Sequence, residues 1–419
     1  MTKKIRILAV CVAVMLMLGA APALAADTPV NLRIAWFGAT VRNEATLAAL
    51  DAYTAEFPHI TFDPEFVGSN PEFSDKLATQ AAAQNIPDII IMDLAWLKDY
   101  ASRGQLLELT DVDTSKINAA IVADGTYNGK FYAMPNSVAS TAFVYNNARV
   151  EDLGLTTVPV NGWSWDDYYA FCEEAKAAVG EDTFVSADFS YSYTMYCAYQ
   201  LSHGKGSPIT VDGQINFDKD TWVEFQELFI DFRDRGIVPP PDISVTNKDG
   251  DVTLDPLLLG KVLIKNAFSS TFGSWDSVEA DTYALVTMPR DVEASDYVKV
   301  SAFWSIAANT KYPAEAQHVV DWLVNSVSAG EALGFVRGSQ VNSDVLAAIT
   351  PDLSSTDQAS AALVEFITPT AQPFTMMAEG WNSFYMTDYE NICQEVMFGV
   401  STPEQAYDAI INKAKEYVK

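Results

Sequence analysis

The chain is short of histidine, cysteine and positive charge. Its 419 residues include three histidines, four cysteines and 26 Lys or Arg against 55 Asp or Glu, which gives a net charge of −29. Such an excess of negative charge repels nucleic acid phosphates and anionic lipid head groups. We therefore expect no nucleic acid partner, and we expect a ligand that is neutral or cationic.

Motifs of the common enzyme classes are also missing. The sequence has no G-x-S-x-G elbow, no P-loop and no H-E-x-x-H motif, and His59, His203 and His318 are far apart in the chain. We accordingly expect no catalytic residues, no cofactor and no metal site. A pair of carboxylates around a glycosidic bond stays open as an alternative, because so many acidic residues form many spatial pairs.

The N-terminus has an apolar run that is too short to cross a membrane. Three basic residues among the first six precede an apolar stretch at 7–18, and residues 23–25 have the A-x-A pattern of a cleavage site. A membrane-spanning helix needs about 20 apolar residues. We interpret 1–25 as a cleaved secretory signal, which implies a periplasmic or extracellular protein. Lipidation at Cys11 is disfavoured because the bulky Val10 precedes it.

Removal of this segment changes the bulk properties of the chain. It deletes three basic and no acidic residues, so the net charge becomes −29 − 3 = −32, and 419 − 25 = 394 residues remain. A chain of this length exceeds what one hydrophobic core usually supports, so we expect two domains. The remaining cysteines are Cys172, Cys197 and Cys393, without a CxxC pair. One disulfide, such as Cys172–Cys197, or three buried thiols both fit an odd number.

Strand and helix signals alternate over the first part of the mature chain. Apolar spacing and alternation predict strands at 30–36, 60–67 and 89–92, and helices at 43–57 and 73–85. The continuous apolar run Ile89–Met92 is typical of a parallel strand that helices cover on both faces. This alternation predicts a doubly wound α/β domain, in which ligands bind beyond the carboxyl ends of the strands.

Residues 125–147 combine a hairpin with a run of small residues. Asn128-Gly129 predicts a type I′ turn, because both positions need a positive φ. We expect Pro135 to end the second strand, because proline has no N–H for the ladder. The small polar run 136–140 then leads into an apolar strand that ends at 145–147. A run of this kind is what a chain needs where it leaves one domain and enters another.

The later part of the chain carries clear helix starts. Ser164 with Asp167 predicts a capped helix, and the segment Thr402 to Gln405 forms a capping box before the last helix. A helix is expected at 313–327. Further strand candidates are 257–268, 283–288 and 298–308.

Taken in order, these segments resemble the extracellular solute-binding proteins of sugar ABC transporters, the maltose-binding-like group. The similarity extends from about residue 31 to the C-terminus. The segments that carry it are 32–38, 87–106 (PDIIIMDLAWLKDYASRGQL), 127–146, 162–168, 301–325 (SAFWSIAANTKYPAEAQHVVDWLVN), 337–342 (RGSQVN) and 399–406.

The resemblance implies an α/β fold of the periplasmic-binding-protein type, with two lobes and three hinge crossings. It places lobe one at 26–138 plus 301–335 and lobe two at 139–300 plus 336–419, with hinges at 137–140, 298–302 and 338–342. It also implies that a monomer captures a neutral mono- or oligosaccharide in the cleft between the lobes. Partner permease subunits of an ABC importer would then receive the saccharide.

Sites of this kind stack aromatic rings on sugar faces and use polar groups for the hydroxyls. By position in the family pattern, the first loop contributes Gly38, Ala39, Thr40 and Arg42, and the loop after the third strand contributes Asp93 and Trp96. Plainer alternatives are a tight turn for Gly38, a surface salt bridge for Arg42 and packing for Trp96. The other expected ligand-binding residues are Tyr191, Tyr193, Phe268, Ser269, Trp304, Trp381 and Tyr385, with Trp275 as an alternative to Phe268.

Three other functions stay open at this point. The first is a secreted carbohydrate-active hydrolase. The second is a binder of the same fold for a polyamine or a metal, whose site would need converging carboxylates or His and Tyr ligands. The third is a sensor subunit that presents its ligand to a membrane receptor.

Overall fold

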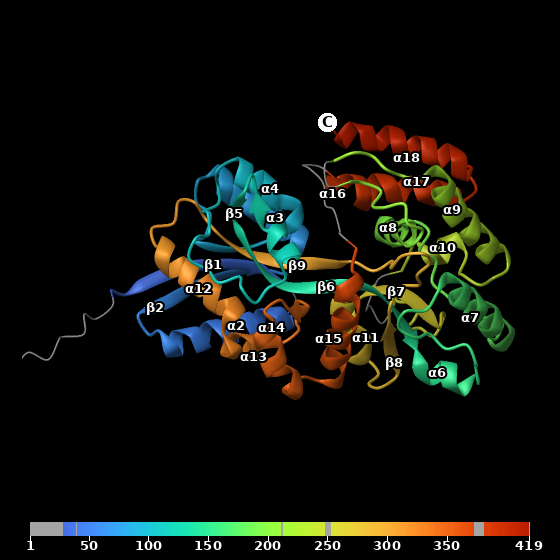
Figure 1. Ribbon diagram of the computed structural model, residues 1–419, viewed down its shortest axis with the longest axis horizontal. Helices are drawn as coiled ribbons and strands as arrows, with labels where there is room; N and C mark the ends of the chain where they lie inside the picture. The colour runs from blue at the N-terminus through green and yellow to red at the C-terminus, as the bar shows by residue number, and fades with distance from the viewer. Residues whose placement is uncertain (1–27, 39, 211–212, 248–252, 373–380, 419) are drawn as a thin grey trace, which may run out of the picture.

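A computed structural model describes residues 28–38, 40–210, 213–247, 253–372 and 381–418. The expected signal segment lies outside these residues, as does Ala39. The chain forms two lobes, which lie to the left and right in Figure 1, and two strands, β6 (Ala133–Asn146) and β9 (Val298–Ile306), run between them. None of the described helices is long and apolar enough to span a bilayer.

The left-hand lobe has the α/β architecture that the sequence predicts. The strand β1 (Val30–Phe37) pairs in parallel with β2 (Ile60–Val67) and with β3 (Ile89–Met92), and β3 pairs antiparallel with β9. Every residue of β3 is buried, as expected for a strand covered on both faces. The helices are α2 (Thr40–Glu56), α3 (Asn70–Ala82), α4 (Leu94–Ser102), α5 (Ala119–Asp124), α12 (Pro313–Asn325) and α13 (Val327–Leu333). The expected single helix at 313–327 is therefore two helices.

The predicted hairpin is confirmed, but the predicted end of its second strand is wrong. Asn128 and Gly129 have φ angles of 49° and 76° between β4 (Thr126–Tyr127) and β5 (Lys130–Phe131). However, β6 runs on through Pro135 to Asn146. The pairing of β6 with β9 shifts its register just after Pro135, and such an irregularity accommodates a residue without an N–H.

The three segments expected to form the hinge lie side by side. On β6, Ser137 is paired with Ala302 of β9 and with Gln340 of β10 (Ser339–Gln340). The chain therefore crosses between the lobes as three adjacent, hydrogen-bonded strands. Single residues at the ends of such strands can absorb the backbone change of a hinge. The residue numbers at which each lobe begins and ends stay a prediction.

The right-hand lobe is built on the second half of β6. This half pairs antiparallel with β7 (Ile264–Phe268) and β8 (Tyr283–Val286), so only the end of the expected strand 257–268 is a strand. Both predicted capping boxes are present, at Ser164 and at Thr402. The helices are α6 (Asn147–Asp152), α7 (Trp165–Ala178), α8 (Tyr193–Ser202), α9 (Lys219–Asp234), α10 (Pro241–Ser244), α11 (Gly273–Asp276), α15 (Ser355–Ile367), α16 (Trp381–Ser383), α17 (Tyr389–Met397) and α18 (Pro403–Tyr417). The helix α14 (Ser343–Ile349), which follows the third crossing, instead packs beside α13 of the left-hand lobe, and its Asp344 forms an ion pair with Lys116.

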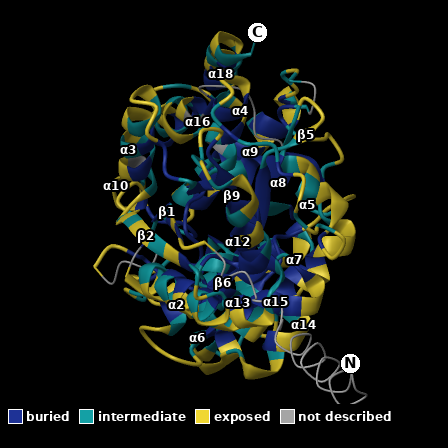
Figure 2. Cartoon of the chain, turned by 90° about the vertical axis from the view of Figure 1, so that its left-hand side faces the viewer, coloured by how far each residue is buried: buried dark blue, intermediate teal, exposed yellow. Residues whose placement is uncertain are grey.

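Each lobe has its own hydrophobic core. One cluster joins β1, β3 and α12 with the lobe-one parts of β6 and β9, and another joins α7, α8, α9, α17 and α18. Figure 2 shows β1 and β9 of the first lobe as largely buried, whereas the edge strand β2 is mostly exposed or half-buried. Cys172, Cys197 and Cys393 are free and buried, which settles the cysteine question in favour of thiols. Burial raises the pKa of Cys197 to about 12.

Candidate functional site

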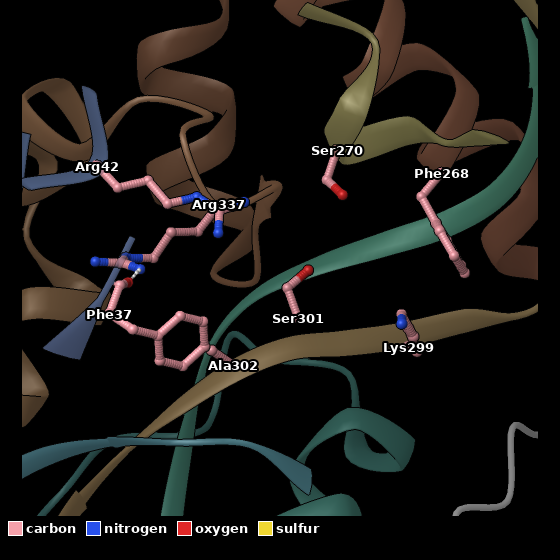
Figure 3. Close-up of a pocket in the computed structure, with 8 residues that line it drawn as sticks. All are labelled: Phe37, Arg42, Phe268, Ser270, Lys299, Ser301, Ala302 and Arg337. Carbon is pink, nitrogen blue, oxygen red and sulfur yellow. Dashed lines mark hydrogen bonds between the residues drawn. The ribbon is translucent and has the colours of Figure 1, made fainter. Parts of the chain in front are cut away.

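A cavity of about 150 Å³ lies beside the three crossing strands. Lobe one contributes Phe37 and Arg42 to its walls, and the segment after β7 contributes residues on the opposite side (Figure 3). The crossing segments themselves form the rest of the lining. The complete set is Phe37, Arg42, Phe268, Ser270, Lys299, Ser301, Ala302 and Arg337.

Arg42 reaches the cavity from the first turn of α2. Its Nε donates a hydrogen bond to the carbonyl oxygen of Val336 at 2.7 Å, which ties the first loop of lobe one to the third crossing. Figure 3 shows the guanidinium pointing into the cavity. Burial lowers the pKa of Arg42, because a charged group loses hydration without a counterion.

Arg337 lies behind Arg42 and is 8 % exposed. It donates hydrogen bonds to the carbonyl oxygen of Phe37 at 3.2 Å and to Thr46 Oγ1 at 3.0 Å, and Figure 3 shows its guanidinium turned toward Phe37. Burial, and then the positive charge of Arg42, lower the pKa of Arg337. Two guanidinium groups therefore share one small region of the cleft.

Lys299 adds a third cation on β9. Its Nζ lies 4.3 Å from the ring centre of Phe268, in a cation–π contact. Burial lowers the pKa of Lys299, and the negative charge of Asp93 partly offsets this effect. The field of Asp93 also reaches Tyr385, whose pKa burial and this charge raise to about 12. Asp93 of lobe one and Tyr385 of lobe two therefore lie near the same part of the cleft.

Two hydroxyl groups complete the polar lining. The side chains of Ser270 and Ser301 point into the cavity from opposite sides (Figure 3). Ser301 Oγ is buried and has no hydrogen-bond partner among the described residues. A buried hydroxyl without a partner is costly, so a ligand that hydrogen-bonds it would recover free energy.

The structure brings several of the predicted site residues to this region. Arg42 and Phe268 line the cavity, and the charge of Asp93 acts on the lining residue Lys299 and on Tyr385. Trp96 is half-buried, and its ring packs against Phe37 at 6.3 Å.

The first loop takes part mainly through its backbone. Gly38 precedes α2, and a β-carbon there would lie 2.7 Å from Cβ of Arg42, so the close approach requires glycine. Thr40 is the exposed first residue of α2. Among the described residues, Arg42 forms no surface salt bridge, and its Nε instead donates to the Val336 carbonyl.

Other predicted residues are enclosed in the lobe cores, which does not support a stacking role in this conformation. Trp304 is fully buried between Ile91 and Met134, its partners on the neighbouring strands. Tyr193 and Trp381 pack within the aromatic core of lobe two, with ring centres 6.1 Å apart.

Three further residues serve the framework of lobe two. Trp275 is buried and donates a hydrogen bond to Asp255. Ser269 Oγ accepts a hydrogen bond from the backbone N–H of Ser140 at 3.1 Å, and the Tyr191 hydroxyl donates to the carbonyl oxygen of Ser244 at 3.3 Å.

Sequence reasoning missed Phe37, Ser270, Lys299, Ser301, Ala302 and Arg337 as lining residues. Lys299 and Ser301 fall inside the predicted hinge segment 298–302, and Arg337 immediately precedes the segment 338–342. The signal was therefore present, because strands that join two lobes necessarily form the floor of the cleft between them. Among the described residues, no group of His, Cys, Asp and Glu could hold a metal ion.

Two α/β lobes, joined by three adjacent strands beside a polar cavity, define a two-lobe ligand-binding protein. The family model described as bacterial extracellular solute-binding protein matches residues 48–338. The chain belongs to this family.

Solved structures agree with this assignment. An extracellular solute-binding protein of family 1 from Alicyclobacillus acidocaldarius is 28% identical, with a TM-score of 0.77 over 94% of this chain and all of that chain. A periplasmic oligogalacturonide binding protein from Yersinia enterocolitica, in complex with saturated digalacturonic acid, has a TM-score of 0.75 at 21% identity, over 93% of this chain and 100% of that chain. At that identity the likeness supports the fold alone.

A curated relative is similar over a shorter region. The maltooligosaccharide ABC transporter solute-binding lipoprotein of Streptococcus pneumoniae is 29% identical over 134 residues, which are 32% of this chain. The match spans about 30% of the length of that relative.

Proposed function

We propose that this protein captures a saccharide in the cavity between its lobes and delivers it to the permease subunits of an ABC importer. The observation that carries the proposal is the composition of the cavity wall. Phe37 and Arg42 come from one side, Phe268 and Ser270 come from the other, and the crossing strands lie between them. A ligand that contacts both sides stabilises the closed arrangement by its differential affinity.

The ligands of related proteins support a saccharide. They are a maltooligosaccharide for the relative from Streptococcus pneumoniae and saturated digalacturonic acid for the protein from Yersinia enterocolitica. Phe37 and Phe268 offer apolar ring surface for a sugar face, and Ser270 and Ser301 offer hydroxyls for its polar edge.

We further propose that the protein binds its ligand without transforming it. A glycosidase needs two carboxyl groups on either side of the scissile bond, whereas the cavity lining contains none. The three cations argue equally against a polyamine ligand, because like charges would repel it. In this proposal the segment 1–25 directs export, and the protein acts as a monomer outside the cytoplasm.

A thermal-shift screen against neutral and acidic mono- and oligosaccharides tests this function. A ligand at about 100 times its dissociation constant adds about 2.7 kcal/mol of stability. We expect a shift with one group of saccharides and no change in their chemical composition by chromatography. Consumption of a saccharide would contradict the binding role, and the absence of any shift would contradict the ligand class.

A further inference from the structure

The charge of the cavity is opposite to the charge of the chain. Arg42, Lys299 and Arg337 line the cavity and no carboxylate does, although acidic residues outnumber basic residues by 55 to 26 over the sequence. The local charge of the cavity lining therefore differs in sign from the net charge of the chain. We therefore look within the site for a group that explains these three cations.

Among the described residues, none of the three cations forms an ion pair with a carboxylate, although the charge of Asp93 acts on Lys299. Arg42 donates its Nε to a backbone carbonyl, and Arg337 donates to a carbonyl and a hydroxyl. Arg337 is nine-tenths buried, and its Nε has no hydrogen-bond partner in the described part of the chain. Lys299 rests on the ring of Phe268. Buried charges are ordinarily paired, because desolvation is costly.

The position of Arg42 on its helix adds to this imbalance. Arg42 lies in the first turn of α2, a helix of 17 residues whose first turn contains no acidic residue. The N-terminus of a helix carries a partial positive charge, so a cation there is unfavourable and an anion is favourable. A cation in this unfavourable position is expected where a bound ligand offsets its charge.

The polar groups that face the cavity can together surround an anion. Figure 3 shows the Arg42 guanidinium and the hydroxyls of Ser270 and Ser301 directed toward one space, with Lys299 at its other end. A guanidinium binds a planar or tetrahedral oxyanion through several N–H groups. Ser301 Oγ has no other partner in the described residues, so its hydrogen is available to an anionic oxygen.

We infer that the saccharide carries a negatively charged group, which Arg42 and Lys299 bind directly, with Ser270 and Ser301 as hydrogen-bond partners and Arg337 as a supporting charge. This inference rests on the proposed function, and it replaces the expectation of a neutral ligand from the net charge. The shared chemistry is an oxyanion on a sugar, whether a carboxylate, a sulfate or a phosphate.

The first experiment tests the anion site without assuming a saccharide. The melting temperature of the purified protein is measured with sodium sulfate and with sodium chloride at equal ionic strength. Sulfate stabilises folded proteins in general, because it is excluded from their surface. We therefore expect sulfate to raise the melting temperature of the wild type clearly more than that of Arg42→Gln or Lys299→Met, which keep only this general effect. The use of two variants protects the test against misfolding of either one.

Arg149→Gln is the matched control. Arg149 also donates to a backbone carbonyl, that of Gly260, and to a threonine hydroxyl, but it does not line the cavity. Its substitution should leave the response to sulfate intact. The same response in Arg42→Gln and Lys299→Met as in the wild type would overturn the inference, and would mean an adventitious ion only.

The second experiment identifies the anionic group. Calorimetry compares α-1,4-digalacturonate with the same disaccharide reduced at its carboxylates, and also uses a sulfated and a phosphorylated saccharide. We expect one acidic saccharide to bind, and its neutral form and the Arg42→Gln protein to bind about tenfold more weakly or worse. Equal binding of the neutral form would overturn the inference but leave the proposed function standing. A response to sulfate without binding of any saccharide would contradict the proposed function and leave the anion site standing.

Discussion

The Nε of Arg42 donates to the carbonyl oxygen of Val336 at 2.7 Å, so that Arg42 lies against the residue that precedes Arg337. One hydrogen bond thereby connects the first loop of lobe one to the third crossing and brings two guanidinium groups together. Their mutual repulsion costs free energy in the ligand-free protein, and a bound anion would relieve it. The two guanidinium groups thus lower the stability of the ligand-free protein, as the residues of functional sites frequently do.

This cost leads to a prediction about Arg42→Gln. We expect the substitution to leave the unfolding free energy of the ligand-free protein unchanged or to raise it, because relief of the repulsion offsets the lost hydrogen bond. Arg149→Gln should instead lower the unfolding free energy by about 1–2 kcal/mol, because it removes hydrogen bonds to the carbonyl oxygen of Gly260 and to Thr183 Oγ1. Urea denaturation measures both values. A larger loss for Arg42→Gln than for Arg149→Gln would contradict the account.

Asp296, two residues before β9, is predicted to make stability depend on pH. Burial raises its pKa to about 7, although Met288 N–H and Thr141 Oγ1 donate hydrogen bonds to it. The folded protein therefore holds a proton that the unfolded chain releases near pH 4, so this residue's contribution to stability falls from about pH 4 to about pH 7 and is constant above.

Asp296→Asn isolates this contribution, because the amide oxygen can accept the same hydrogen bonds without a charge. Relative to the wild type, the variant should gain unfolding free energy as the pH rises from about 4 to about 7 and then keep a constant gain. Urea titrations at several pH values measure the difference. A difference that does not vary with pH would show that Asp296 does not titrate in this range.

A buried ion pair supports lobe two away from the cavity. Lys265 Nζ lies 3.2 Å from Asp255 Oδ2, both side chains are fully buried, and Trp275 Nε1 donates to the same carboxylate at 2.8 Å. Lys265→Met would leave a buried carboxylate without its cation and should lower the unfolding free energy by about 3–5 kcal/mol. Lys413→Met, which removes more exposed pairs with Glu416 and Asp388, should change the unfolding free energy far less. Similar effects of the two substitutions would refute this ranking.

Gly338, in the third crossing, cannot be replaced by a residue with a β-carbon without a loss of stability. Its φ is +120°, and a β-carbon there would lie 2.5 Å from the carbonyl oxygen of Val138. Gly338→Ala should therefore lower the unfolding free energy by about 2–3 kcal/mol. Gly399→Ala is a control with φ +69° and no atom within 4 Å of the added carbon, and it should cost about 1 kcal/mol. Chemical denaturation compares the two, and equal losses would mean that the contact with Val138 relaxes freely.

The alternation of apolar and polar residues was sufficient to predict the strands of lobe one and the capped helices, because these signals are local. Pro135 shows where local reasoning fails. A proline ends a strand only if its missing N–H is needed, and the register shift between β6 and β9 removes that need. The pairing partner that makes this possible lies more than 160 residues away in the sequence, so nothing near Pro135 could indicate it.

The site was less predictable than the fold for a related reason. Arg42 and Phe268 could be proposed as ligand-binding residues from their positions after strands in the family pattern. Lys299 and Arg337 could be proposed only once the crossing segments are known to lie side by side. The many aromatic residues made the site harder to predict instead. Trp304 and Trp381 are of the residue type that stacks on sugars, but the packing of each lobe buries their side chains. The net charge of the chain does not indicate the charge of the cavity lining, since a sum over all residues does not describe one local group.

The central claim is that one saccharide contacts both lobes at this cavity. The most direct test is calorimetry with the saccharide that gives the largest thermal shift, using Arg42→Gln from lobe one and Phe268→Ala from the opposite wall. The account predicts that each substitution raises the dissociation constant about tenfold or more, while Arg149→Gln leaves it unchanged. If either substitution at the cavity leaves the dissociation constant at the wild-type value, the ligand does not bridge the two lobes here, and the claim is contradicted.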